Sequence, residues 1–126
     1  MTTYNYEFSY RKLNVYNLSK ELVKDIYALT DRFPRMENYS LINQLRRAAV
    51  SVPSNIAEGS GRESYGEQHQ FYNISLGSLM EVMCQLEIAN ELDYVEQPLF
   101  NELEEKIIFI HKMLKAMIKK SRELSK

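Results

Sequence analysis

The sequence predicts an all-α fold, an antiparallel up-down-up-down four-helix bundle. Apolar residues recur at steps of three and four along almost the whole chain, and glycines and prolines interrupt that pattern where loops belong. No segment shows the strict alternation of a half-buried strand. The 126 residues are accounted for by a single domain, 1–126, with helices at about 11–32, 39–59, 64–92 and 98–124.

The first and fourth helices show the helical spacing most plainly. In the first, apolar residues run from Val15 to Phe33, where Pro34 and a polar stretch end the pattern. The fourth begins at Pro98, a residue suited to a first helical turn. Its apolar positions form a seam typical of helix bundles, made of Phe100, Leu103, Ile107, Ile110, Leu114, Met117, Ser121 and Leu124.

The second predicted helix contains Pro53, which lacks an N–H and normally interrupts a helix. Apolar residues nevertheless stay on one face across the proline. We therefore expect one helix kinked at Pro53, with Ser51, Ser54 and Asn55 close enough to satisfy freed backbone groups. Its predicted core face is Leu41, Leu45, Ala48, Ala49, Val52, Ile56 and Gly59.

The third predicted helix starts with a capping box. Ser64 is the expected N-cap, and Glu67 stands three residues later. The apolar spacing then continues to about Leu92. The predicted core face comprises Tyr65, Phe71, Tyr72, Leu79, Val82, Met83, Leu86 and Ala89.

Two helices carry more apolar surface than one bundle core requires. This surplus favours a homo-oligomer, because large exposed apolar faces usually meet a partner. The alternative is that the wide helix faces of a kinked bundle absorb these side chains. The candidate interface residues, predicted to lie on flanks away from the core, are Ile42, Val50, Pro53, Ala57, Ile74 and Ile88, with Cys84 beside them.

A polar face on the second helix is the candidate for a nucleic-acid contact or a contact between subunits. It contains Arg46, Arg47, Asn55, Glu58 and Arg62. Arginines on such a face can bind phosphates, but Glu58 can also pair with Arg62 four residues on, and Asn55 with the kinked backbone. The basic residues near the end of the chain are explained as charge complementing the negative end of the helix dipole.

No catalytic or metal-binding pattern emerges. His69 and His111 lack the preceding glutamates of di-metal bundles, and Cys84, in an apolar run, is expected to be a small buried hydrophobe. The segment from Gly59 to Ser64 resembles part of a phosphate-binding loop, but it matches neither the dinucleotide-binding fingerprint nor the P-loop. We expect no enzymatic activity, no cofactor and no metal.

Charge and targeting signals set the remaining expectations. The chain has 16 Lys and Arg against 17 Asp and Glu, a net charge of −1, which argues against a strongly basic nucleic-acid binder. The first residues lack the features of a signal peptide, and no apolar run approaches a membrane span. A cytoplasmic protein with no membrane partner is therefore expected.

Three segments together carry a family resemblance. The stretch Q-L-R-R-A-A-V-S-V-P-S-N-I-A-E-G, from Gln44 to Gly59, closely resembles the hallmark segment of the 23S rRNA intervening-sequence protein family. Residues 10–16 resemble the family's opening F-x-x-L-x-V-W, with Tyr16 in place of the usual Trp. Residues 74–81 resemble its A-x-G-S-x-x-E segment. The likeness covers about residues 10–120.

The resemblance implies a non-enzymatic antiparallel four-helix bundle that assembles into a ring, typically a pentamer. Some family members are encoded within insertions in ribosomal RNA genes, and related bundles act as accessory subunits of reverse transcriptases. RNA or another nucleic acid, and by analogy a reverse transcriptase, are thus implied as partners. The related retroelement bundles are strongly basic, whereas this chain is not. A protein-interaction module without nucleic-acid affinity is the alternative function.

Overall fold

The computed structural model describes residues 6–126, and this part of the chain is helical with no strand. A short 3₁₀ helix precedes the first long helix, and a second 3₁₀ turn lies in the connection between the first two long helices. The elements are η1 (Ser9–Lys12), α1 (Asn14–Thr30), η2 (Arg35–Glu37), α2 (Leu41–Ser60), α3 (Tyr65–Glu91) and α4 (Gln97–Leu124).

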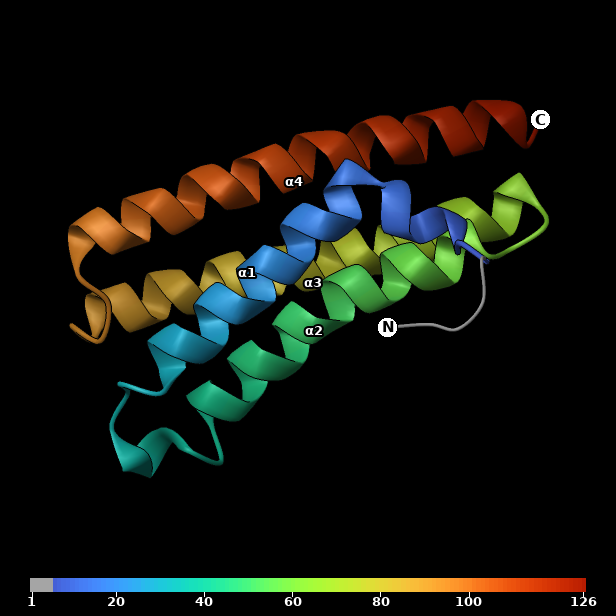
Figure 1. Cartoon of the computed structure of the whole chain (residues 1–126). Helices are drawn as coiled ribbons and strands as arrows, with labels where there is room; N and C mark the ends of the chain where they lie inside the picture. The colour runs from blue at the N-terminus through green and yellow to red at the C-terminus, as the bar shows by residue number, and fades with distance from the viewer. Residues whose placement is uncertain (1–5) are drawn as a thin grey trace.

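The four long helices form a bundle. Each packs against the next along the chain, and α1 also packs against α4, which closes the circle. In Figure 1 successive helices run in opposite directions, and the α2–α3 turn lies at the end of the bundle that carries the C-terminus. The predicted all-α four-helix bundle is confirmed. Among residues 6–126, no helix is long and apolar enough to cross a membrane.

Local sequence signals explain where α3 and α4 begin. The Ser64 side chain accepts a hydrogen bond from the Glu67 N–H at 3.1 Å, as the capping box predicts. Pro98 lies in the first turn of α4. The first helix begins later than expected, because residues 9–12 form η1 and Leu13 is extended before α1 starts.

Helix α2 continues through Pro53 as one α-helix. Two side chains donate to the carbonyls just before the proline: Asn55 Nδ2 to Ser51 O at 2.8 Å, and Ser75 Oγ from α3 to Val52 O at 2.8 Å. The expectation that polar side chains bond the backbone here is confirmed for Asn55. The kink itself stays a prediction.

The core lies along the bundle axis and matches the predicted faces closely. Residues of all four long helices form one buried apolar cluster. On α4 the predicted seam holds as far as Leu114, but the next buried residue is Ile118, while Met117 is half-buried and Leu124 is exposed. A step of four follows the 3.6-residue turn better than the predicted step of three at this point. Tyr65, at the start of α3, is also exposed instead of buried.

Candidate nucleic-acid and assembly surfaces

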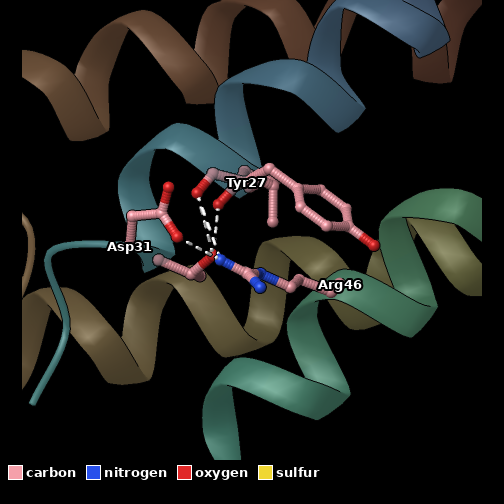
Figure 2. Close-up of polar contacts among 5 residues, drawn as sticks. Tyr27, Asp31 and Arg46 are labelled. Carbon is pink, nitrogen blue, oxygen red and sulfur yellow. Dashed lines mark hydrogen bonds and ion pairs between the residues drawn. The ribbon is translucent and has the colours of Figure 1, made fainter. Parts of the chain in front are cut away.

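Arg46 connects α2 to the end of α1 (Figure 2). Its Nε donates to Thr30 Oγ1 at 2.8 Å, and its Nη2 donates to Asp31 Oδ1 at 2.8 Å and to the Tyr27 carbonyl at 3.4 Å. The guanidinium carbon lies 4.5 Å from the centre of the Tyr27 ring. With 27% of its side chain exposed, Arg46 is engaged within the chain and holds two helices together.

Arg47 and Arg62 differ from Arg46 and from each other. Arg47 is exposed and forms no ion pair with any residue between 6 and 126. Arg62 Nη2 pairs with Glu58 Oε2 at 2.9 Å, and its guanidinium lies over the Phe71 ring at 4.7 Å from the centroid. The predicted pairing of Glu58 with Arg62 is confirmed, so Arg47 is the free cation of this face.

Asn55 belongs to a polar network between α2 and α3. Besides the Ser51 carbonyl, its Nδ2 reaches Ser51 Oγ at 2.9 Å, and that hydroxyl lies 2.8 Å from Ser78 Oγ. These groups are half-buried or buried. The structure therefore uses most of the predicted polar face for contacts inside the bundle and does not gather its five residues into one pocket.

Two of the predicted interface residues are buried within the chain, for different reasons. Ile42 is buried and belongs to the core cluster, and Pro53 is also buried. Pro53 lines a groove between α1 and α2 together with the aromatic rings of Tyr10 and Tyr16, because the segment before α1 folds back over this flank. These two side chains therefore pack within the chain, while Val50 remains exposed and Ala57 is half-buried.

The outer surface of α3 carries an exposed stripe at helical spacing. Its members are Ile74, Gly77, Glu81, Cys84 and Ile88, and all five are exposed. Ile74 is 52% exposed and Ile88 is 45% exposed. Cys84 was expected to be buried, and that prediction is wrong: the apolar run around it supplies both the inner and the outer side of α3. We call these five residues the α3 outer stripe.

The groove between α1 and α2 has a volume of 410 Å³ and an apolar lining that includes Val23, Val50 and Pro53. Two cations, Lys20 and Lys24, stand at its edge, and neither forms an ion pair within residues 6–126. Lys20 Nζ lies 4.9 Å from the centre of the Tyr16 ring. The groove thus combines an apolar floor with a positive edge.

A row of cations on α4 was not among the predicted site residues. It faces a groove of 540 Å³ between α3 and α4, whose wall on α3 contains Asn73 and Leu76. The row has exposed side chains spaced three and four residues apart along the helix. The sequence signal was present, but the residues were assigned to the helix dipole alone. We call the row the α4 basic stripe: Lys112, Lys115, Lys119 and Arg122 on α4, and Lys126 just after the helix end, of which all but Lys112 line this groove.

Polar contacts elsewhere are structural. Lys106 on α4 reaches Asp25 at 2.7 Å and Glu21 at 3.6 Å on α1, and the hydrogen bond that Lys106 donates to Asp25 raises the pKa of Lys106. Tyr94 donates to Glu37 at 2.9 Å, joining the two loops at one end of the bundle. Within the part of the chain that the structure describes, no group of His, Cys, Asp and Glu is suited to hold a metal ion.

A family model for the 23S rRNA-intervening sequence protein matches residues 11–116. The chain belongs to this family. A crystal structure from Bacteroides thetaiotaomicron, of a protein with unknown function from the S23 ribosomal protein family, is similar with a TM-score of 0.77 and 23% identity. The match covers 83% of this chain and 98% of that one; at this identity it shows the fold. A comparison with curated proteins found no significant match.

Proposed function

We propose that this member of the 23S rRNA-intervening sequence protein family is a non-enzymatic scaffold that assembles with copies of itself and associates with nucleic acid. The α3 outer stripe carries the proposal for assembly. Helix α3 is apolar on its inner side, where Leu79, Val82 and Leu86 are fully buried, and it also presents Ile74 and Ile88 to the outside. A helix with apolar residues on both sides is typical of one that is covered on both sides.

Gly77 strengthens this argument. A glycine inside a helix costs about 0.5–1 kcal/mol relative to alanine, and here a Cβ would meet nothing within 4 Å. Packing within the chain therefore gives no reason for a glycine at this position. Close approach of a second chain at the centre of the α3 outer stripe supplies one.

A second copy offers a complementary surface. The outer side of α3 combines apolar side chains with the exposed carboxylates of Glu81 and Glu91, whereas the α1–α2 groove combines an apolar floor with Lys20 and Lys24. These surfaces lie on different faces of the bundle. Their contact would be heterologous, and repetition of a heterologous contact closes into a ring when the rotation allows it. Five copies are the number that the family resemblance implies.

The assembly is tested by placing charges on the proposed interface. The double variant Ile74→Lys/Ile88→Lys should sediment as a monomer at a micromolar concentration where the wild type forms a larger species, because it buries two ammonium groups without partners. The matched control is Ile108→Lys/Phe109→Lys, which changes two α4 residues that are 46% and 59% exposed. This control should sediment like the wild type.

Two results would contradict the proposal. A monomeric wild type would overturn the proposed assembly. Equal loss of assembly in both double variants would mean that added charge, and not the α3 outer stripe, is responsible. Circular dichroism of each variant shows whether the bundle remains folded, which is expected because all four side chains are exposed.

The nucleic-acid part of the proposal draws on the family to which the chain belongs and on the exposed cations that form no ion pairs within residues 6–126. In this proposal the protein acts in the cytoplasm as an accessory protein for RNA, or by family analogy for a reverse transcriptase. The competing function is a protein-interaction module without nucleic-acid affinity. Salt-dependent binding of RNA separates the two, because contacts with phosphates weaken steeply as salt rises.

A further inference from the structure

We infer that the α4 basic stripe and the groove beside it form a binding track for the phosphate backbone of a nucleic acid. The inference rests on the proposed association with nucleic acid and gives it a site, away from the arginines of α2. The five cations of the α4 basic stripe are separated by three, four, three and four residues along the chain. This spacing places Lys112, Lys115, Lys119 and Arg122 on one face of α4 over about 15 Å, at 1.5 Å rise per residue, and Lys126 follows just after the helix ends at Leu124.

The stripe concentrates charge that nothing in the described chain neutralises. Residues 112–126 contain six Lys or Arg and one Glu, although the whole chain has a net charge of −1. None of the five stripe cations forms an ion pair with residues 6–126. Like charges three and four residues apart on a helix repel each other. A bound polyanion would remove this repulsion.

The helix dipole explains only part of the stripe. Its effect falls off within the last turn of a helix, and α4 ends at Leu124. Arg122 and Lys126 lie at that end, but Lys112, Lys115 and Lys119 lie one or more turns before it. For these three lysines the dipole is not a sufficient reason, and the regular repeat of cations suggests a ligand with regularly repeated anions.

The surroundings of the stripe favour a backbone over other anionic partners. The groove contributes an amide side chain, Asn73, and a single acidic side chain, Glu123. Leu114 and Ile118, which lie between the stripe cations, are buried in the bundle, and the exposed Ile108 and Phe109 lie before the first stripe lysine. The stripe itself therefore lacks the continuous apolar face with which an amphipathic helix inserts into a lipid surface. The chemistry fits extended electrostatic contact with phosphates, which carries no preference for base sequence.

The test is a binding titration with the full chain and a short labelled RNA duplex, its single strand and the corresponding DNA duplex. The triple variant Lys115→Gln/Lys119→Gln/Arg122→Gln should bind at least about tenfold more weakly at low salt, and the slope of log affinity against log salt should fall by roughly 2–3. Its matched control, Lys12→Gln/Arg32→Gln/Arg35→Gln, removes the same charge from exposed positions outside both the stripe and the α1–α2 groove. Arg47→Ala tests the exposed arginine of α2.

Each result has a distinct meaning. Loss of binding in the stripe variant with retention in the control supports the track, and the three probes show whether RNA or DNA is preferred. Equal affinity of wild type and stripe variant overturns the track but leaves nucleic-acid association standing, with Arg47→Ala showing whether α2 provides it. No binding of any probe by the wild type overturns both. Binding to anionic lipid vesicles but to no nucleic acid would also overturn the inference.

Discussion

The adjacent residues Arg46 and Arg47 on α2 have very different surroundings. Arg46 makes three hydrogen bonds to the end of α1 and lies over the Tyr27 ring, whereas Arg47 points away into solvent. The i,i+4 pairing of Glu58 with Arg62 could be predicted because it is local to one helix. The contacts of Arg46 could not be predicted from the sequence, because they depend on where α1 lies relative to α2.

Arg46→Ala should therefore destabilise the fold, and Arg47→Ala should not. Losing charged hydrogen bonds and a cation–π contact is expected to lower the free energy of unfolding by about 2 kcal/mol. The neighbouring Arg47→Ala variant should stay within about 0.5 kcal/mol of the wild type. Urea denaturation of both variants checks this prediction, and equal stability of the two would contradict the assigned role of Arg46.

At the scale of elements, periodicity predicted the four helices and most of their buried faces. The errors in the predicted helix bounds and buried residues lie where the local sequence pattern does not determine the structure. The first helix was expected to begin at about residue 11, but residues 9–12 form η1, which packs against α2. Pro53 is buried on this flank of α2, which Tyr10 and Tyr16 also line. The burial of Cys84 was mispredicted for a similar reason. The apolar run around it contributes to both sides of α3, and the sequence does not indicate which side is covered.

Two glycines on neighbouring helices should respond oppositely to alanine. At Gly59 on α2, a Cβ would lie 2.8 Å from Tyr72 Cε1 and 3.0 Å from Phe71 Cβ, so Gly59→Ala should destabilise the bundle by about 1–3 kcal/mol. At Gly77 a Cβ meets nothing, and Gly77→Ala should stabilise the separated chain by about 0.5–1 kcal/mol while weakening assembly.

Denaturation and sedimentation of both glycine variants provide the measurement. Denaturation is done at protein concentrations too low for assembly, so that only folding is compared. If Gly77→Ala destabilised the single chain as much as Gly59→Ala, the glycine would have a role inside the bundle, and the argument that it serves a second chain would lose its basis.

At the scale of the whole molecule, a near-zero net charge conceals separated surfaces. The basic stripe lies at the C-terminal end of α4, the acidic residues of α3 face outward, and the lysines of α1 border an apolar groove. The net charge follows from composition alone. The separation of the charged surfaces depends on how the helices pack, so the sequence could not predict it. Under the two proposals, it lets a chain of net charge −1 present both an interface for its own copies and a track for phosphates.

Cys84 provides the most direct measurement of the central claim, that the outer side of α3 is covered by a second copy. The thiol is exposed in the single chain and is the protein's one cysteine, so its alkylation rate reports on the α3 outer stripe alone. The rate should fall as protein concentration rises through the micromolar range, and it should stay high at every concentration in Ile74→Lys/Ile88→Lys. A wild-type rate that is high and independent of concentration would contradict the account.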